Sequence, residues 1–289
     1  MNVIAALLVE AAPAKINLAL HVTGRRADGY HLLESLVAFA ELGDRIEVRP
    51  TNEDHFFIGG RFGGELAADN HNLVLRARDA LRQAVALTPL SPVSIHLEKM
   101  LPVASGIGGG SSDAAAALRL LNRLWGSPLT VEQLAALARQ LGADVPMCLA
   151  ARPLIARGIG EMVEPVALPA LAMVLVNPGV AVSTPQVFGR LESRENPPLP
   201  PLPRHADFAG LVGWLIATRN DLEAPARQMA PVIGDALDAL ASSGAAFSRM
   251  SGSGATCFGL FATPSAAQAA ATTIRHARPN WFVEATATN

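Results

Sequence analysis

A run of glycine and serine near the middle of the chain most constrains how it can fold. The run is Gly106-Ile107-Gly108-Gly109-Gly110-Ser111-Ser112, between an alternating apolar stretch at 93–101 and an Ala-rich stretch with Leu118, Leu121 and Trp125 at helical spacing. A strand, a glycine loop and a helix start together favour phosphate binding, because glycine lets the backbone approach the anion and the helix N-terminus attracts it. A flexible loop before a surface helix is the weaker interpretation, since so much glycine is costly in chain entropy.

Other phosphate-binding motifs do not fit this loop. A Walker P-loop needs a lysine directly after glycine, and neither Lys15 nor Lys99, the two lysines of the chain, follows one. The dinucleotide fingerprint needs Gly or Ala three places after its second glycine, where this chain has Ser111 or Asp113. The sequence also contains no HRD or DFG tripeptide, which excludes the protein-kinase pattern.

Composition excludes several classes of protein. Half of the 289 residues are hydrophobic and 17% are charged, which excludes a disordered chain. A net charge of −2 provides no basic field, so we expect no nucleic-acid partner. Two distant cysteines, Cys148 and Cys257, fit a reducing cytoplasm better than a disulfide framework or a zinc site. The uncharged stretch 165–189 contains four prolines, so we expect no membrane partner.

Strands and helices are mixed without strict βαβ alternation, which predicts an α+β fold. Residues 14–22 alternate and predict a half-buried strand with Lys15 and Asn17 on its non-core face. Thr130-Val131-Glu132-Gln133 is a capping box, and Gly142 ends the helix that follows it. Further strands are expected at 36–40 and 45–49, around a turn at Gly43-Asp44, and at 171–176 and 256–261. One further helix is expected to open on serine directly after the glycine run, and another to begin at residue 184. The other expected helices are at 72–87, 208–217, 226–241 and 266–276.

The glycine run carries a family resemblance. Pro102-x3-Gly106-Ile107-Gly108-Gly109-Gly110-Ser111-Ser112 resembles the central motif of the GHMP kinase superfamily. Pro13-Ala14-Lys15-Ile16-Asn17-Leu18 and Arg26-Ala27-Asp28-Gly29-Tyr30-His31 look like the members of that superfamily that act on 4-diphosphocytidyl-2-C-methyl-D-erythritol; Gly142-Ala143-Asp144-Val145-Pro146 and Gly252-Ser253-Gly254-Ala255-Thr256 match too. The resemblance implies a ribosomal-protein-like βα domain over 1–165, which binds ATP, and a ferredoxin-like domain over 166–289.

The resemblance also implies a reaction. ATP, with Mg²⁺, would donate its γ-phosphoryl group to the 2-hydroxyl of the small-molecule cytidine diphosphate substrate, in non-mevalonate isoprenoid biosynthesis. Asp144 matches the catalytic aspartate, which accepts the hydroxyl proton. Lys15 matches the catalytic lysine, which within about 3–4 Å keeps Asp144 ionised and neutralises charge on the transferred group. The alternatives are that Asp144 only caps the turn starting at Val145-Pro146 and that Lys15 is an exposed strand residue.

The binding residues follow from the same resemblance. Tyr30 and His31 would read the cytosine, and Phe188 would lie on its other face, with core packing as the alternative for Phe188. The full set for the substrate is Asn17, Tyr30, His31 and Phe188; the set for ATP is Pro102, Val103, Ala104, Ser105, Gly106, Ile107, Gly108, Gly109, Gly110, Ser111 and Ser112, with Lys99 and Asn72 on the adenosine side.

Four points about these residues stay open. Ser111 or Ser112 could cap the helix, hold a phosphate oxygen or contact Mg²⁺, which should arrive with ATP because no carboxylate cluster builds a metal site. Lys99 either follows the end of its strand or points inward at an anion. Asp113 stands where relatives commonly have Asn and is left out, because a carboxylate repels phosphate. Two alternative functions remain. The chain could phosphorylate another alcohol, of the mevalonate or homoserine kind, although Tyr30 and His31 argue against this. It could also be a non-catalytic module that binds nucleotide or RNA.

Overall fold

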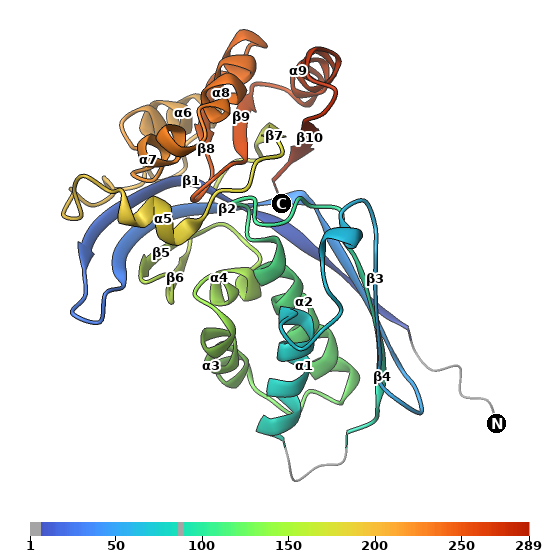
Figure 1. The fold of residues 1–289 in the computed structure, drawn as a ribbon. Coiled ribbons are helices and arrows are strands. Elements are labelled where there is room, and N and C mark those ends of the chain that lie inside the picture. Colours follow the sequence, from blue (N-terminus) through green and yellow to red (C-terminus); the bar gives the residue numbers. More distant parts are fainter. Residues whose placement is uncertain (1–6, 86–89, 289) are drawn as a thin grey trace. The chain divides into compact units, whose positions relative to one another are not determined.

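The computed structural model describes residues 7–85 and 90–288 (Figure 1), which form two compact units. The first unit holds Met1–Ala14, Gly43–Val103 and Gly108–Ala151, and the second holds Lys15–Leu42, Ala104–Ile107 and Arg152–Asn289. Two long strands, β1 (Leu8–Arg25) and β2 (His31–Pro50), contribute residues to both units. The domain boundary at 165/166 stays a prediction.

The first unit combines a sheet with a group of helices. Strand β4 (Val93–Glu98) pairs antiparallel with the second half of β2 and parallel with β3 (His55–Gly59). The helices, in chain order, are η1 (Gly63–Glu65, a 3-10 turn), α1 (Leu73–Ala84), α2 (Gly109–Leu124), α3 (Val131–Leu141) and α4 (Val145–Ala150). Helix α2 packs against α1 and α4 (Figure 1), so the helix that opens on the glycine run is the buried centre of this unit.

Local sequence signals set the ends of these helices. The side chain of Asn72 accepts the backbone N–H two residues later and caps α1; the predicted end of that helix, Leu87, lies outside the described residues. Thr130 and Gln133 form the reciprocal capping box of α3, and Gly142 is its C-cap, so both predictions are confirmed.

The second unit contains a four-stranded antiparallel sheet in the order β10-β7-β9-β8. In chain order the strands are β7 (Ala172–Asn177), β8 (Phe247–Met250), β9 (Cys257–Phe261) and β10 (Phe282–Ala287). Helices separate β7 from β8 and β9 from β10, so the spatial order is fourth, first, third, second. That is the βαββαβ arrangement of a ferredoxin-like fold, and the prediction for this part of the chain is confirmed.

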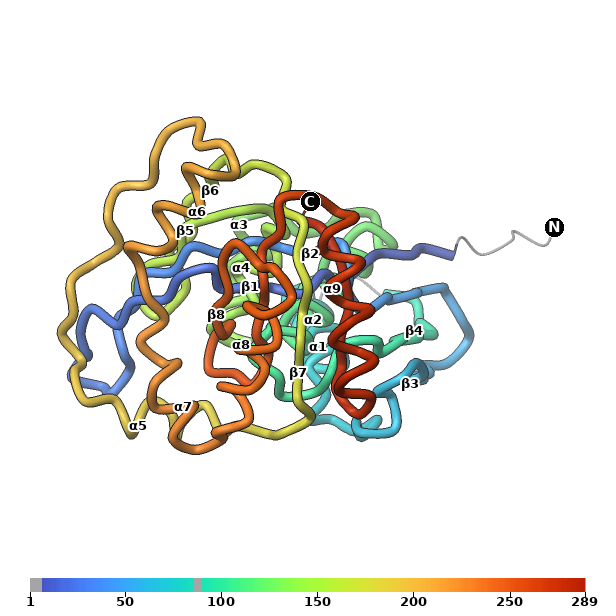
Figure 2. Tube along the Cα trace, turned by 90° about the horizontal axis from the view of Figure 1, so that it is seen from above, coloured from blue at the N-terminus to red at the C-terminus, as the bar shows by residue number. Residues whose placement is uncertain are grey.

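The second unit also contains part of another sheet and five helices. The first half of β2 pairs antiparallel with β5 (Leu154–Gly158), which pairs with β6 (Met162–Pro165). The helices are α5 (Thr184–Gly189), α6 (Phe208–Ile216), α7 (Glu223–Met229), α8 (Val232–Ser242) and α9 (Pro264–Ala277). Helices α8 and α9 both lie along β7 (Figure 2). Among helices in residues 7–85 and 90–288, none has both the length and the apolar character needed to cross a membrane.

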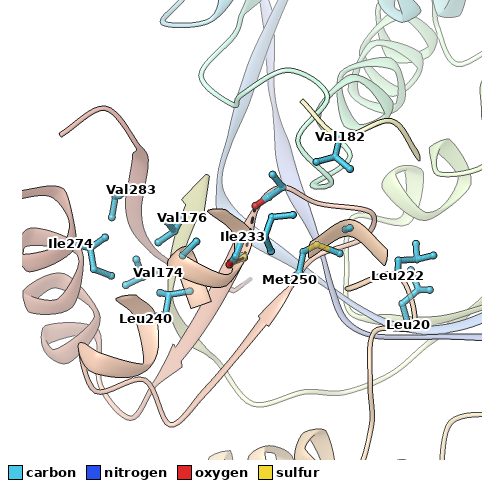
Figure 3. Close-up of a cluster of buried hydrophobic side chains, with 14 of the residues drawn as sticks. Leu20, Val174, Val176, Val182, Leu222, Ile233, Leu240, Met250, Ile274 and Val283 are labelled. Atoms are coloured by element: carbon cyan, nitrogen blue, oxygen red, sulfur yellow. Dashed lines mark hydrogen bonds between the residues drawn. The ribbon is translucent and has the colours of Figure 1, made fainter. Parts of the chain in front are cut away.

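The core of the second unit lies between these two helices and the sheet. Figure 3 shows Val174 and Val176 of β7 among Ile233 and Leu240 of α8 and Ile274 of α9, and all five are buried. Burying one such side chain stabilises a fold by about 1.5–3 kcal/mol. Because these residues recur at strand and helix spacing, the sequence pattern is sufficient to predict this core.

The predicted exposure of one strand is wrong. Strand β1 is buried on both faces: Lys15 is only 4% exposed and Asn17 only 2%, as deep as their apolar neighbours. A polar residue can occupy a buried face when its groups are hydrogen-bonded, and Asn17 Nδ2 donates to Ser35 Oγ at 2.8 Å. The alternation of polar and apolar residues therefore predicted the strand β1 correctly, but it did not predict that the face with the polar side chains is buried.

Two predicted element boundaries are also wrong. Residues 36–40 and 45–49 belong to one continuous strand, β2, without a turn at Gly43-Asp44. A Cβ atom on Gly43 would overlap the carbonyl oxygen of Ala12, so glycine serves close strand approach there. The helix predicted at 226–241 is two helices, α7 and α8, with Pro231 between them, because proline has no N–H for a continuous helix.

His21 on β1 is a fully buried histidine whose two ring nitrogens both have partners. Nδ1 lies 3.0 Å from the carbonyl oxygen of Pro197, and Nε2 accepts the N–H of Arg219 at 3.1 Å. Nδ1 therefore carries the single proton of a neutral ring. Burial is the main cause that lowers the pKa of His21.

We expect this histidine to make the fold acid-sensitive. Because its pKa is lower in the folded than in the unfolded chain, stability is full above the unfolded value of about 6.5 and is lost as the pH falls below it. Urea unfolding between pH 7.5 and 5.0 measures this. His21→Gln should lose about 1–3 kcal/mol at pH 7.5 and depend less on pH below 6.5. The exposed His276→Gln is the control and should keep the wild-type profile; an unchanged acid dependence in His21→Gln would contradict the assignment.

Candidate active site

The second unit holds one part of the glycine run, Ala104–Ile107, against a loop from near the C-terminus. Ser251 Oγ donates to the carbonyl oxygen of Gly106 at 3.1 Å, and the N–H of Thr256 donates to the carbonyl oxygen of Ser105 at 3.0 Å. Gly106 has a φ of +78°, and a Cβ atom there would lie 2.5 Å from the carbonyl oxygen of Ser251. Only glycine can occupy this position without displacing the backbone.

The first unit holds the part of the glycine run that opens α2. Gly108 adopts the left-handed conformation at φ 63°, and α2 begins at Gly109, earlier than the predicted opening on serine. The N–H groups of the first turn have no partner within the helix, and the helix dipole favours an anion beside them. Ser112 is buried and its Oγ donates to the carbonyl oxygen of Pro13 at 2.7 Å, whereas Ser111 is partly exposed.

Lys99 lies at the centre of a buried charge cluster in the first unit. Its Nζ is 2.5 Å from Asp44 Oδ2 and 2.7 Å from Asp113 Oδ2, and Lys99 is 2% exposed. Asp44 Oδ1 also accepts the N–H groups of Met100 and Leu101. Both sequence interpretations of Lys99 hold together, because β4 ends at Glu98 and the lysine then turns inward to two carboxylates.

The electrostatics of this cluster are those of two acids sharing one base. Burial is the main cause that raises the pKa of Asp113 to about 8; attraction to Lys99 lowers it and repulsion from Asp44 raises it further. Burial by itself would lower the pKa of Lys99, but the two carboxylates raise it above its ordinary value. Asp113 Oδ1 is buried without a hydrogen-bond partner, so a proton on this oxygen costs no existing contact.

Asp144 is the N-cap residue of α4, but its side chain makes no capping hydrogen bond. Pro146 in the first turn already helps this short helix to begin. The carboxylate of Asp144 therefore does not cap α4, which was the alternative function for this residue.

Lys15 and Asn17 lie next to the glycine run in the second unit. The backbone N–H of Lys15 donates to the carbonyl oxygen of Ile107 at 2.9 Å, and that of Asn17 donates to Ser251 Oγ at 3.0 Å. Asn17 Oδ1 is buried and has no hydrogen-bond partner. An orphaned buried acceptor is costly, and a ligand donor is one way to satisfy it.

The predicted cytosine-binding residues come together in the second unit. The rings of His31 and Phe188 stack with centroids 4.8 Å apart and an interplanar angle of 24°. Tyr30, next to His31 in the chain, is 58% exposed, so its ring is open to a ligand. His31 Nε2 is buried without a partner, and burial is the main cause that lowers the pKa of this histidine. Phe188 also packs against the core of the unit, so core packing is part of its role.

Comparison with known proteins identifies the family. The model of the GHMP kinase N-terminal domain matches residues 72–152, and that of the GHMP kinase C-terminal domain matches residues 204–280. The chain is 59% identical to 4-diphosphocytidyl-2-C-methyl-D-erythritol kinase of Rhizobium etli over 97% of this chain and 95% of that protein, and 57% identical to the enzyme of the same name from Mesorhizobium japonicum over 95% and 94%. The chain belongs to the 4-diphosphocytidyl-2-C-methyl-D-erythritol kinases, in the GHMP kinase family.

Solved structures agree with this family. A crystal structure of 4-(cytidine 5'-diphospho)-2C-methyl-D-erythritol kinase superimposes with a TM-score of 0.80 at 35% identity, over 98% of this chain and 99% of that chain. Homoserine kinase from Cytophaga hutchinsonii superimposes with a TM-score of 0.69 at 21% identity, over 97% and 93%, and supports the fold. The predicted two-domain GHMP kinase architecture is confirmed, and membership makes this chain an ATP-dependent phosphotransferase.

The sequence predicted part of this GHMP kinase site and missed part. His31 stacks on Phe188, and Asn17 lies beside the glycine run, but Lys15 and Asp144 belong to different units and their proximity stays a prediction. The adenosine contacts of Lys99 and Asn72 also stay predictions. Three residues with clear structural roles had no assigned function in the sequence: Asp44, Asp113 and Ser251. Their partners are distant in the chain, so no local pattern could reveal them.

Proposed function

We propose that the chain transfers the γ-phosphoryl group of ATP to the 2-hydroxyl of 4-diphosphocytidyl-2-C-methyl-D-erythritol, in non-mevalonate isoprenoid biosynthesis. The observation that carries this proposal is 59% identity, over nearly the whole of both chains, to a relative that bears the name of this activity. The orphaned Asn17 Oδ1 and His31 Nε2 in the second unit support it, because a polar ligand such as a nucleotide can satisfy both atoms.

In this reaction Asp144 accepts the proton of the substrate hydroxyl as it attacks the γ-phosphorus. Lys15 supplies positive charge for the transferred phosphoryl group, which carries most of the negative charge in the transition state. A carboxylate that does not cap α4 can act as a base, and a lysine held within a buried strand face has a fixed position. Phosphoryl transfer depends mainly on positioning and electrostatic stabilisation, and a fixed charge contributes to both.

The triphosphate would bind at the glycine-opened end of α2, through backbone N–H groups. Among the described residues, no three His, Cys, Asp or Glu side chains gather as metal ligands. Mg²⁺ fits this chain best as an ion that phosphate oxygens and water largely ligate, with Ser111 as the serine open to it, because the Ser112 hydroxyl is already donated to Pro13. Tyr30, His31 and Phe188 would bind the cytosine.

We also propose that the chain works in the cytoplasm, which is supported by the absence of a disulfide between its two cysteines, Cys148 and Cys257. We propose no nucleic-acid or membrane partner.

A coupled assay of ADP formation tests the function. The purified chain should produce ADP with ATP, Mg²⁺ and 4-diphosphocytidyl-2-C-methyl-D-erythritol, and far less with mevalonate or homoserine. Lys15→Ala should lower kcat by about 10²–10³-fold, the usual cost of removing a group that stabilises transition-state charge. Equal rates with the simpler alcohols would favour another GHMP substrate, and RNA binding at physiological salt without any ADP formation would favour a non-catalytic module.

A further inference from the structure

A segment of the second unit between α5 and α6 is fixed at two points, on either side of an arginine. Leu191 is buried in the core of the unit. Asn196 donates both its backbone N–H and its side-chain Nδ2 to the carbonyl oxygen of Val22 on β1, at 3.2 and 3.0 Å. Arg194 therefore lies on a short stretch of chain that cannot move far, close to the end of β1.

Arg194 has unused hydrogen-bonding capacity. Its Nε is buried and has no hydrogen-bond partner. Within residues 7–85 and 90–288, no carboxylate forms an ion pair with it, although Glu192 and Glu195 are its near neighbours in the sequence. A buried guanidinium donor without an acceptor is unfavourable, so the arrangement calls for an acceptor from outside the chain.

The surroundings of Arg194 show which kind of acceptor fits. Arg194 and Arg25 both act electrostatically on the ring of His31, and both disfavour its charged form. The Nε of Arg25 donates to the carbonyl oxygen of Gly29 at 3.2 Å, which holds this second cation beside the β1–β2 turn. The stacked ring of His31 thus has a buried nitrogen without a partner and lies within the electrostatic reach of two arginines.

We propose that Arg194, together with Arg25, binds the diphosphate group of a pyrimidine nucleoside diphosphate ester whose base lies at Tyr30, His31 and Phe188. This inference rests on the proposed function and adds to it the residues that select the diphosphate. Guanidinium groups suit this role, since their planar fork of N–H donors matches phosphate oxygens and they stay charged at any physiological pH. Because both arginines act on the ring of His31, an anionic group bound beside that ring is attracted by both of them.

The test is calorimetric binding of cytidine, CMP and CDP without ATP, so that catalysis plays no part. Arg194→Gln should weaken CDP binding by about 10–100-fold, since charge-assisted hydrogen bonds are lost, and leave cytidine binding unchanged. Arg194→Lys should restore part of the lost affinity, because it returns the charge without the fork. Arg190→Gln, at an exposed arginine on the same segment, is the matched control and should bind all three ligands like the wild type.

In the coupled assay, Arg194→Gln should raise KM for the cytidine substrate and leave KM for ATP unchanged. Equal weakening of cytidine, CMP and CDP would overturn the inference, because the arginine would then support the base site or the fold. Unchanged CDP affinity would overturn it as well. Both results leave the proposed function intact if the wild type binds CDP, whereas a wild type that binds no cytidine ligand contradicts the proposed function itself.

Discussion

Replacing Asp144 by asparagine is expected to lower kcat by about 10²–10⁴-fold, the usual contribution of a positioned general base. Asparagine has the same shape as aspartate but cannot accept the hydroxyl proton. The fold should tolerate the change, because asparagine is as good an N-cap residue as aspartate and the native side chain makes no capping hydrogen bond. Steady-state kinetics should therefore show the loss in kcat, and calorimetry should show nearly unchanged ATP binding.

Asp207→Asn is the matched control for this experiment. Asp207 is also the N-cap residue of a helix, α6, and its Oδ1 accepts the N–H of Gly210 at 2.8 Å. Asp207 is thus an N-cap residue like Asp144, but it has no proposed role as a general base. The Asp207→Asn variant should keep the wild-type kcat. Undiminished turnover in Asp144→Asn would refute the base role. Loss of ATP binding together with turnover would indicate a role in holding the nucleotide.

The parts of the fold that could be predicted from sequence are those that depend on neighbours in the chain. The capping box at Thr130 and the cap at Asn72 act over two or three residues, so their motifs are sufficient. The turn predicted at Gly43 failed for the opposite reason. The residue that requires glycine there is Ala12, some thirty positions earlier, and a local glycine signal cannot distinguish close strand approach from a turn.

The site divides in the same way. The glycine run and the aromatic pair of His31 and Phe188 were predictable because family motifs mark them. The buried cluster around Lys99 could be predicted only in part. Lys99 occupies a position of the strand pattern where apolar residues are expected, which suggested that it points inward at an anion. The two acids could not be identified, because Asp44 comes from a distant strand and Asp113 from α2. Asp113 was set aside as repulsive to phosphate, and the structure shows that its side chain accepts a hydrogen bond from Lys99 inside the first unit.

Replacing Lys99 by methionine should strongly destabilise the first unit. Removing one partner of a buried ion pair leaves an uncompensated charge and costs about 3–5 kcal/mol. Here two buried acidic side chains, Asp44 and Asp113, would lose their shared cation. Urea unfolding of the nucleotide-free chain measures the loss. Arg45→Met is the matched control: Arg45 neighbours Asp44 but its ion pairs to Glu47 and Glu98 are exposed, so it should cost about 1 kcal/mol or less.

The pH dependence of Lys99→Met separates lost charge compensation from lost packing. Lys99 lowers the pKa of Asp113 against the burial that raises it, so without Lys99 the folded variant should bind this proton more tightly than the folded wild type does. The variant should then gain stability relative to the wild type as the pH falls from 8 to 6, the reverse of the change expected from His21.

A triple variant that combines Lys99→Met with Asp44→Asn and Asp113→Asn should recover much of the stability at pH 8, because no buried charge remains in the cluster. The amide introduced by Asp44→Asn keeps an oxygen that can accept the N–H groups of Met100 and Leu101. A deficit in Lys99→Met that is the same at pH 6 and 8, and that the triple variant does not reduce, would show that the lysine acts through packing alone.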